Sequence, residues 1–260
     1  SEKMTHSTIA QGHSEDIRLS SVEAYNRTMK DSVSVIIPAF NEEIDIEESV
    51  KTVLRLVSSC IDDFEVIVVN DGSTDDTGKI IARLAQKIKR IKVATHKRNL
   101  GFGQAFRSGI NFATKNYITG FPADLDMTKK TLTDFVRARK KADIVSSYMT
   151  NLDKREFSRR IISVFFIRLM NLIFRLNLKY YNGYFISRRD LLKNLNLKSI
   201  GFTIFAEIKV KLIKRGASVL EIPFENRPRI HGVSKATTWN AVMQTINGVF
   251  MLVKDIYFLH

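Results

Sequence analysis

The sequence predicts an α/β domain built on a mostly parallel sheet that helices cover on both faces. Short segments rich in valine and isoleucine alternate along the chain with segments whose apolar residues recur at helical spacing. The short segments are apolar almost throughout, which is typical of strands that are buried on both faces. The loops that follow these strands carry polar residues and glycine, as expected where a parallel sheet binds its ligand.

The expected strands are short apolar runs that end at proline, glycine or polar residues. They lie at Val33–Ile37, Phe64–Val69, Ile91–Thr95, Tyr117–Phe121, Ala142–Ser146 and Ser218–Ile222. The expected helices are the amphipathic stretches between and after them. They lie at Ile44–Val57, Asp76–Ile88, Gly103–Ala113, Lys130–Lys140 and Phe157–Tyr181, with a last helix through Trp239, Val242, Met243, Ile246, Phe250 and Val253.

This pattern divides the chain into three parts. Residues 1–31 are polar and read as a loosely attached arm, with a short helix expected near Ser20–Met29. Residues 32–235 form the main domain, and residues 236–260 form an amphipathic C-terminal segment that can lie on a membrane surface. That segment carries too many polar residues to cross a bilayer, which takes about 20 predominantly apolar residues.

Charge and composition restrict the partners. The net charge of +14 and a pI near 9.8 favour anionic partners such as nucleotides or phospholipid headgroups. Aromatic residues lie in apolar runs rather than between lysines and arginines, so we expect no nucleic-acid partner. The single cysteine, Cys60, excludes a disulfide within the chain, and no apolar signal-peptide core is seen at the start.

The expected helix at Phe157–Tyr181 has two interpretations. Its apolar residues form a broad face, and several arginines and a lysine interrupt that face. The helix is therefore either a core helix with a solvated basic face or a helix in a membrane interface, where basic residues meet anionic lipid. The apolar residues are Phe165, Phe166, Leu169, Leu172, Ile173 and Leu176, and the basic ones are Arg159, Arg160, Arg168, Arg175 and Lys179.

Asp124 and Asp126 are one residue apart and follow the expected strand at Tyr117–Phe121. Alternate side chains of extended backbone point the same way, so both carboxylates can converge on one point. Their mutual repulsion favours a cation between them, and Mg²⁺ or Mn²⁺ prefers such oxygen ligands. The alternative is a turn that caps the next helix.

Two further loops carry candidate binding groups, and a third segment is rich in small residues. Asp71 stands at a strand tip beside Gly72, where its carboxylate could bind a base or ribose. Arg229 and Lys235 flank a glycine and could neutralise a diphosphate leaving group. The small residues in 99–109 match no phosphate-binding fingerprint, so we expect them to allow a helix to approach the sheet closely.

Taken in order, these motifs resemble the family 2 glycosyltransferases of the GT-A fold, which is Rossmann-like. The resemblance rests on Val35–Glu43, Val68–Asp75, Asn99–Ala105, the pair at 124 and 126, and Arg229–Lys235. The last motif, Arg-x-x-Gly-x-Ser-Lys, is similar to that of polyprenyl-phosphate sugar synthases of the dolichyl-phosphate mannose synthase type.

The resemblance implies roles for individual residues. The nucleotide sugar would be held by Pro38, Phe40, Glu42, Val69, Asp71, Ala123, Asp124, Arg229 and Lys235. Asp124 and Asp126 would hold Mg²⁺ or Mn²⁺ and the diphosphate, and both are candidate catalytic residues together with Arg168. Arg168 and Asn171 match the family's Arg-x-x-Asn and would bind the phosphate of the acceptor.

The implied reaction is inverting transfer of a sugar from a nucleotide diphosphate, such as GDP-mannose or a UDP-sugar, to a polyprenyl phosphate. The expected location is peripheral, at the cytoplasmic face of a membrane. The chain departs from the family where Pro122 replaces the first of its usual aspartates, and at 147–148 and 182–185, where arginines are missing. Two alternatives therefore stay open: a family 2 enzyme with a hydroxyl acceptor, or a nucleotide-sugar-binding protein without turnover. With a hydroxyl acceptor, Glu207 could be the base, although an exposed helix position is the more ordinary expectation for it.

Overall fold

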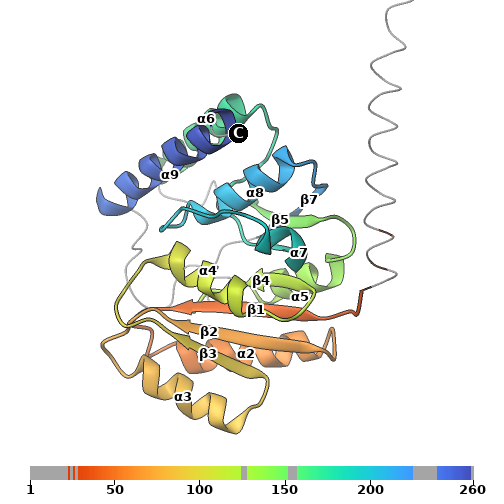
Figure 1. Ribbon diagram of the computed structural model, residues 1–260, viewed down its shortest axis with the longest axis vertical. Helices are drawn as coiled ribbons and strands as arrows, with labels where there is room; N and C mark the ends of the chain where they lie inside the picture. Colours follow the sequence, from red (N-terminus) through yellow and green to blue (C-terminus); the bar gives the residue numbers. More distant parts are fainter. Residues whose placement is uncertain are drawn as a thin grey trace, which may run out of the picture.

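A computed structural model describes residues 23, 26, 29–123, 128–151, 157–224 and 239–258 (Figure 1). Its strands are β1 Val33–Ala39, β2 Phe64–Asn70, β3 Ile91–Thr95, β4 Tyr117–Gly120, β5 Ile144–Met149, β6 Phe185–Arg188 and β7 Val219–Phe224. Its helices are α2 Ile46–Ser58, α3 Thr77–Lys87, α4 Phe102–Phe112, α5 Lys129–Ala138, α6 Phe157–Phe174, α7 Arg189–Lys193, α8 Ile204–Lys214 and α9 Trp239–Tyr257.

The strands form one seven-stranded sheet in the order β3-β2-β1-β4-β6-β5-β7. β1 pairs in parallel with β2 and β4, β2 with β3, and β5 with β7, whereas β6 is antiparallel to both of its neighbours. The carboxyl ends of β1 to β5 and β7 therefore lie at one edge of the sheet, and β6 begins at that edge. The prediction of a mostly parallel α/β sheet is confirmed.

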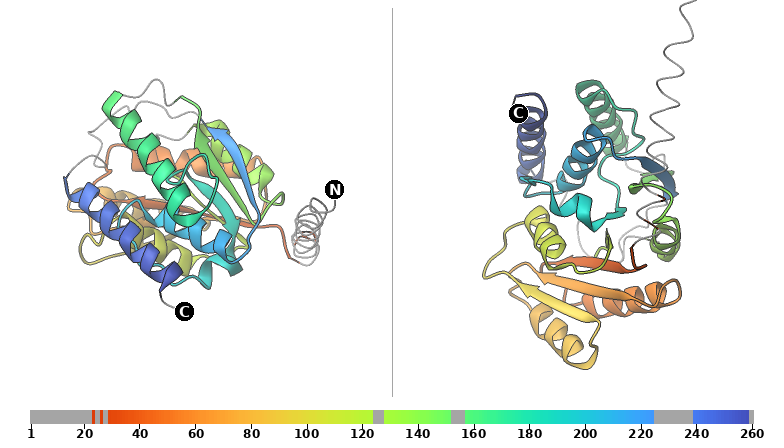
Figure 2. Two further views of the ribbon diagram at one scale, coloured as in Figure 1. Left: turned by 90° about the horizontal axis from the view of Figure 1, so that it is seen from above. Right: turned by 45° about the vertical axis from the view of Figure 1, so that its right-hand side comes forward.

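Helices cover both faces of the sheet in layers (Figure 2). α2, α3 and α5 pack on one face through the core cluster around Val35, Val53 and Phe135. α4, α7 and α8 pack on the other face through the cluster around Ile36, Phe106 and Phe205. α6 and α9 lie beyond α8 as an additional layer, joined to it through a third apolar cluster.

The six predicted strands are present, but β6, α7 and α8 were not predicted. β6 has only four residues, and in α8 the charged residues Glu207, Lys209 and Lys211 alternate with apolar ones, so neither segment shows the pattern that identifies its kind of element. The predicted end of the long helix at Tyr181 is wrong, because α6 ends at Phe174. Arg175 adopts a left-handed conformation with φ of 49°, which terminates the helix.

Of the predicted arm, residues 1–31, the structure describes residues 23, 26 and 29–31. The Asn26 carboxamide donates to the carbonyl oxygen of Lys140 at 3.0 Å and accepts from the Tyr117 hydroxyl, so this residue contacts the main domain. Within the described residues, no helix has both the length and the apolar character that crossing a bilayer requires.

Candidate functional site at the carboxyl edge of the sheet

The loops 40–43 and 71–76, which follow β1 and β2, are joined by hydrogen bonds at the carboxyl edge. The Asn41 side-chain oxygen accepts from the Thr74 N–H at 2.9 Å, and the Asn41 N–H donates to Ser73 Oγ at 3.1 Å. Asn41 has a φ of 54°, a left-handed conformation that asparagine tolerates better than most residues. Each loop therefore donates a hydrogen bond to the other, and the two loops are held together as one structural unit.

Acidic side chains extend this unit to the start of α3. The Glu42 N–H donates to Thr77 Oγ1 at 2.9 Å, and the Glu43 N–H donates to Asp75 Oδ2 at 3.2 Å. The Asp76 N–H in turn donates to Glu43 Oε2 at 2.9 Å. Burial alone would raise the pKa of Asp75, but hydrogen bonds from Thr77 and the Glu43 N–H outweigh it, so this pKa lies below its usual value. The charged carboxylate thus keeps both loops in place.

The donor-site residues predicted in this region lie together. Pro38 and Val69 are register partners at the ends of β1 and β2. The Asp71 N–H donates to the carbonyl oxygen of Ala39 at 2.8 Å, directly before Phe40. Val69 is fully buried in the core cluster that includes α4, so its side chain cannot face the edge. Glu42, half-buried, belongs to the loop that follows β1.

Asp71 is the centre of the candidate site, and only 3% of it is exposed. Its carboxylate accepts from the Leu100 N–H at 2.9 Å and from the Gly101 N–H at 2.9 Å. Its Oδ1 also lies 2.6 Å from His96 Nδ1, and His96 Nε2 lies 2.9 Å from Ser108 Oγ on α4. Asp71 was predicted to bind a ligand, and the structure shows that it also binds the loop after β3.

Two glycines mark close approaches in this region. Gly72 has a φ of 70°, and a Cβ there would lie 2.3 Å from the carbonyl carbon of Arg98. Only glycine fits this contact between the loops after β2 and β3. A Cβ on Gly109 would lie 2.4 Å from Ile36 Cγ2, which confirms that a small residue of 99–109 lets α4 approach the sheet.

The segment after β4 reaches the same edge. The Phe121 N–H donates to the carbonyl oxygen of Ile36, and the Ser49 hydroxyl on α2 donates to the carbonyl oxygen of Ala123. Ala123 is therefore fixed beside the ends of β1 and β4. The residues predicted to hold the metal and the diphosphate lie outside the described residues: Asp124, Asp126, Arg229 and Lys235. Among the residues that the structure describes, no group of three or more His, Cys, Asp or Glu side chains could hold a metal ion.

The candidate acceptor residues lie on α6. Arg168 is exposed and lies between Phe165 and Leu172, which are 65% and 78% exposed. The Asn171 side chain donates to the Leu178 carbonyl oxygen and accepts from the Leu178 N–H, both at 3.0 Å. It also accepts from the Tyr181 hydroxyl at 2.8 Å. Asn171 thus closes the turn after α6, and Arg168 is the better candidate for contact with a phosphate.

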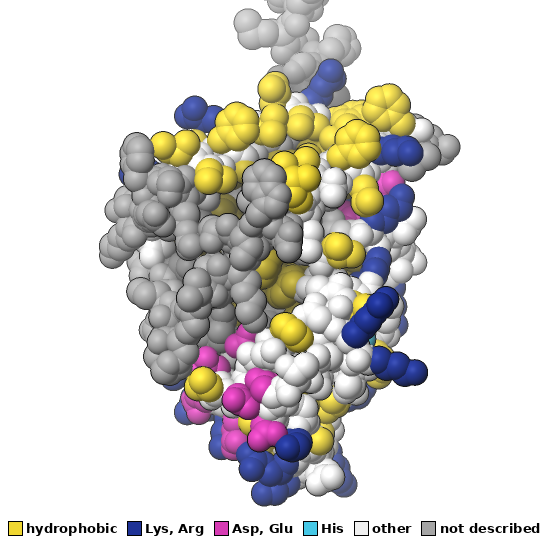
Figure 3. Space-filling model, turned by 90° about the vertical axis from the view of Figure 1, so that its left-hand side faces the viewer, with side chains coloured by type: hydrophobic (Ala, Val, Ile, Leu, Met, Phe, Trp, Pro, Cys, Tyr) yellow, Lys and Arg dark blue, Asp and Glu magenta, His cyan; other side chains and the backbone are white. Residues whose placement is uncertain are grey.

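The outer surface of α6 and α9 is apolar to an unusual degree. Figure 3 views the carboxyl edge and shows apolar side chains across the top of the molecule with lysine or arginine beside them, and acidic side chains lower on the same face. The exposed apolar residues of this layer are Ile161, Ile162, Phe165, Leu172, Met243, Ile246, Phe250, Met251, Tyr257 and Phe258. One side of α6 packs on the core, as a core helix does, and the other side exposes apolar side chains together with Arg168.

The ordinary expectation for Glu207, an exposed helix position, is wrong. Glu207 is 3% exposed on α8 and accepts from the N–H groups of Lys198 and Ser199. Its carboxylate also pairs with Lys211 Nζ at 2.7 Å, and Lys211 pairs in turn with Asp255 of α9. Glu207 therefore joins α8, α9 and the 198–199 loop, and these contacts occupy the carboxylate that a general base would need.

Lys209 is a buried charge to which the sequence did not point. It is 1% exposed, and its Nζ donates to the carbonyl oxygens of Gly183 at 2.8 Å and Tyr180 at 3.4 Å. Burial lowers the pKa of Lys209 to about 7, although the Glu221 carboxylate opposes the shift. Lys209 therefore holds the segment before β6 at the carboxyl edge. A lysine in a helix normally indicates a solvated face, so the sequence contained no signal for this role.

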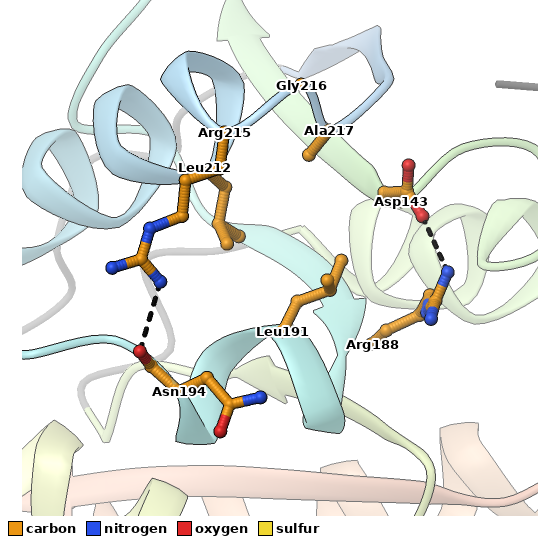
Figure 4. Close-up of a pocket in the computed structure, with 8 residues that line it drawn as sticks. All are labelled: Asp143, Arg188, Leu191, Asn194, Leu212, Arg215, Gly216 and Ala217. Atoms are coloured by element: carbon orange, nitrogen blue, oxygen red, sulfur yellow. Dashed lines mark hydrogen bonds and ion pairs between the residues drawn. The ribbon is translucent and has the colours of Figure 1, made fainter.

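A pocket of about 280 Å³ lies at the opposite edge, beside the start of β5 and the end of β6 (Figure 4). Its polar groups are engaged with one another. Arg188 pairs with Asp143 at 2.9 Å, and Arg215 donates to the carbonyl oxygen of Asn194 at 3.0 Å. The pocket is thus separate from the interlocked loops.

Comparisons with known proteins place this geometry in context. Residues 34–195 match the sequence profile of glycosyl transferase family 2. The chain is 26% identical over 230 residues to a dolichol-phosphate mannosyltransferase of Pyrococcus furiosus, covering 85% of this chain and 64% of the relative. It is 24% identical over 219 residues to an uncharacterized glycosyltransferase of Synechocystis, covering 84% and 68%. A third relative, an uncharacterized glycosyltransferase of Bacillus subtilis, is 25% identical over 139 residues, and the match spans 53% of this chain and 43% of that protein.

Solved structures share the fold. The glucosyl-3-phosphoglycerate synthase of Mycobacterium tuberculosis in complex with Mg²⁺ and UDP superposes with a TM-score of 0.67 at 16% identity, covering 90% of this chain and 83% of that one. The same synthase with Mn²⁺, UDP-glucose and phosphoglyceric acid also gives 0.67, at 17% identity with 90% and 83% coverage. At these identities the likeness concerns the fold alone, and it confirms the expected Rossmann-like GT-A fold.

Proposed function

Because the chain belongs to glycosyl transferase family 2, we propose that it transfers a sugar from a nucleotide diphosphate to a polyprenyl phosphate at the cytoplasmic face of a membrane. The proposed nucleotide-sugar donor rests on one observation. The loops at the carboxyl edge, which lie within the residues that match the family, are joined by hydrogen bonds. In an open α/β sheet this edge is where ligands bind. Solved structures of this fold include complexes with UDP and with UDP-glucose, which supports a nucleotide-sugar donor.

The metal and the diphosphate are proposed to lie beside Ala123. Asp124 and Asp126 follow this fixed residue directly, and two carboxylates are the donor set that Mg²⁺ or Mn²⁺ prefers. When bound, the ion would neutralise the negative charge of the diphosphate. Arg229 and Lys235 would add positive charge against the same group.

The proposed reaction is a displacement at the anomeric carbon of the sugar. A phosphate oxygen of the acceptor forms the new bond, the bond from that carbon to the nucleoside diphosphate breaks, and the nucleoside diphosphate leaves with the electron pair. Inversion follows because the nucleophile and the leaving group occupy opposite faces of the carbon. A phosphate monoester is already ionised at neutral pH, so the acceptor needs no strong general base. This agrees with the engagement of Glu207 in structural contacts.

The proposed polyprenyl-phosphate acceptor and membrane location rest on the α6–α9 layer. Arg168 lies within an exposed apolar stripe, so an arginine that can bind phosphate is surrounded by surface that suits an apolar chain. The match to a dolichol-phosphate mannosyltransferase adds support. Exposed arginines beside the apolar side chains suit anionic headgroups at a membrane surface. The polyprenyl phosphate and the peripheral membrane location are both proposed on these grounds.

Ligand-induced thermal stabilisation tests the donor half. We expect GDP-, UDP- or dTDP-sugars to raise the melting temperature, more strongly with Mn²⁺ than without it, because a ligand that binds only the folded state stabilises it. No change with any of these nucleotide sugars would contradict the proposal.

Acceptor competition tests the second half and separates the alternatives. With one labelled donor, polyprenyl phosphate in vesicles should receive the sugar, while a glycan or lipid that offers only hydroxyl groups should not. Transfer only to the hydroxyl compound would favour the alternative family 2 activity. Donor binding with neither transfer nor hydrolysis would favour a binding protein, to which the replacement of an aspartate by Pro122 also points.

A further inference from the structure

Asp71 and His96 form a chain of hydrogen bonds that reaches from the candidate donor site to α4. His96 Nδ1 lies 2.6 Å from Asp71 Oδ1, and His96 Nε2 lies 2.9 Å from Ser108 Oγ. The His96 side chain is 13% exposed and that of Asp71 4%. The His96 N–H also donates to the carbonyl oxygen of Asn70 at 2.9 Å, so backbone and side chain both fix this residue.

The partners of Asp71 determine which nitrogen of His96 carries the proton. Its carboxylate faces the N–H groups of Leu100 and Gly101, as expected for an ionised carboxylate, which can only accept. His96 Nδ1 must then carry a proton and donate it to Oδ1. In the neutral imidazole, Nε2 accepts from the Ser108 hydroxyl. In the imidazolium, Nε2 donates to Ser108 Oγ, and the bond to Asp71 is kept in both states.

This arrangement leaves the two carboxylate oxygens of Asp71 unequal. Oδ1 takes the bonds from His96 and Leu100, which satisfy both of its lone pairs. Within the described residues, Oδ2 takes one bond, from the Gly101 N–H, and can accept a second one. That second bond requires a single N–H or O–H group.

We propose that His96 is a positioning residue of the donor site. By donating from Nδ1 it fixes the rotamer of Asp71, which in turn fixes the 100–101 backbone and directs the free lone pair of Oδ2 toward a nucleoside donor group. The identity of the ligand, a nucleoside, rests on the proposed function. The effect of His96 on Asp71 in the protein without ligand does not.

Two substitutions separate this role from packing, because each keeps one half of the imidazole. His96→Asn places an amide N–H near the position of Nδ1 and can still donate to Asp71. His96→Gln places its amide near the position of Nε2 and loses that bond. We expect hydrogen exchange at Leu100 to be at least about tenfold faster in His96→Gln, and within about twofold of wild type in His96→Asn, since a hydrogen bond to a charged group is lost only in the first. Gly101 reports less, because its N–H also donates to Asn99 Oδ1 at 3.0 Å.

Nucleotide affinity gives a second measurement on the same variants. With UDP and GDP as probes in the presence of Mn²⁺, His96→Gln should raise Kd about tenfold, whereas His96→Asn should stay within about twofold. Ser108→Ala is the matched control, because it removes the bond at Nε2 but leaves the donor at Nδ1. It should behave as His96→Asn does in both measurements.

Equal exchange and equal affinity in the Asn and Gln variants would overturn the proposal, since a packing role does not distinguish the two nitrogens. The tautomer of wild-type His96, read from its ring ¹⁵N chemical shifts, is a check that requires no substitution. A proton on Nδ1 is expected, and a neutral ring protonated at Nε2 would overturn the proposal even if a variant failed to fold. Hydrogen exchange and the tautomer are measured without nucleotide and test the role of His96. Binding of UDP or GDP by the wild-type protein tests the proposed function, so the two can fail separately.

Discussion

The loops at the carboxyl edge and the α6–α9 layer differ in how their polar groups are arranged. In the loops, side chains bind backbone N–H groups of neighbouring loops, as Asn41 binds Thr74 and Asp71 binds Leu100. The described part of the outer layer instead exposes large apolar side chains such as Phe250, at 70%, with arginines between them. Hydrogen bonds fix the polar groups of the loops, whereas the α6–α9 layer presents an exposed apolar surface.

This difference indicates which ligand each region suits. Loops that hydrogen bonds hold in place can select a small polar molecule, because each hydrogen-bonding group in them has a defined direction. An apolar surface with basic residues suits a large partner whose contacts are not directional, such as a lipid surface. Substitutions in each region test this division.

The first prediction concerns the metal and diphosphate. Asp124→Asn and Asp126→Asn should each lower the rate of sugar transfer at least about a hundredfold, because each removes a charge that holds the ion against the leaving group. Initial rates with a labelled donor measure this. Asp134→Asn is the matched control, since among the described residues that carboxylate pairs with Lys130 alone, on the surface of α5. Wild-type rates in both Asp124 and Asp126 variants would contradict the assignment.

The second prediction concerns the acceptor. Arg168→Gln should lower kcat/KM for polyprenyl phosphate about ten- to a hundredfold, the effect of losing one charged hydrogen bond to phosphate. The affinity for the nucleotide should not change. Arg160→Gln, at another exposed arginine of α6, provides the comparison. Equal losses in both variants would show that Arg168 contributes only general positive charge.

The third prediction concerns the surface. Phe250→Ser should weaken binding to vesicles that contain anionic lipids about tenfold, because burial of a phenylalanine side chain contributes about 1.5–3 kcal/mol. Phe112→Ser on α4 removes a side chain that is 52% exposed and lies outside the α6–α9 layer, so it should have no effect. Sedimentation with vesicles measures both. Equal effects of the two substitutions would contradict a specific membrane face.

The fourth prediction concerns stability. Lys209 has its pKa lowered to about 7 in the folded protein, so between pH 7 and its usual value of 10.5 the unfolded chain binds more protons at this residue. The free energy of unfolding should therefore rise with pH above 7, by at most about 1.4 kcal/mol per pH unit. Urea unfolding at pH 7, 8 and 9 measures this rise. Lys209→Met should make the curve flatter, and equal slopes in both proteins would show that Lys209 is not desolvated.

The two regions also differ in how far the sequence predicted them. The strands that end at Ala39 and Asn70 were visible because buried strands are continuous apolar runs, and the loops after them carry recognisable motifs. Asp71 was singled out because no structural role in the sequence explained it. Its bonds to Leu100 and His96 could not be foreseen, because they join residues at least 25 positions apart.

The second half of the chain was predicted less well. In α8 the charged residues Glu207, Lys209 and Lys211 alternate with apolar ones, which hides the helical period, and β6 is a short antiparallel strand between β4 and β5. The end of α6 depends on the side chain of Asn171, which binds the backbone of Leu178. Such contacts override the local apolar pattern, and that pattern would have continued the helix to Tyr181.

The nucleotide is proposed to bind between the loops at the carboxyl edge. Hydrogen exchange of the whole protein, with and without UDP or GDP in the presence of Mn²⁺, tests this binding site. We expect slower exchange in segments 38–43, 70–75 and 98–103 when nucleotide is present. Protection confined to the pocket beside Asp143 and Arg188, or no protection at either place, would contradict it.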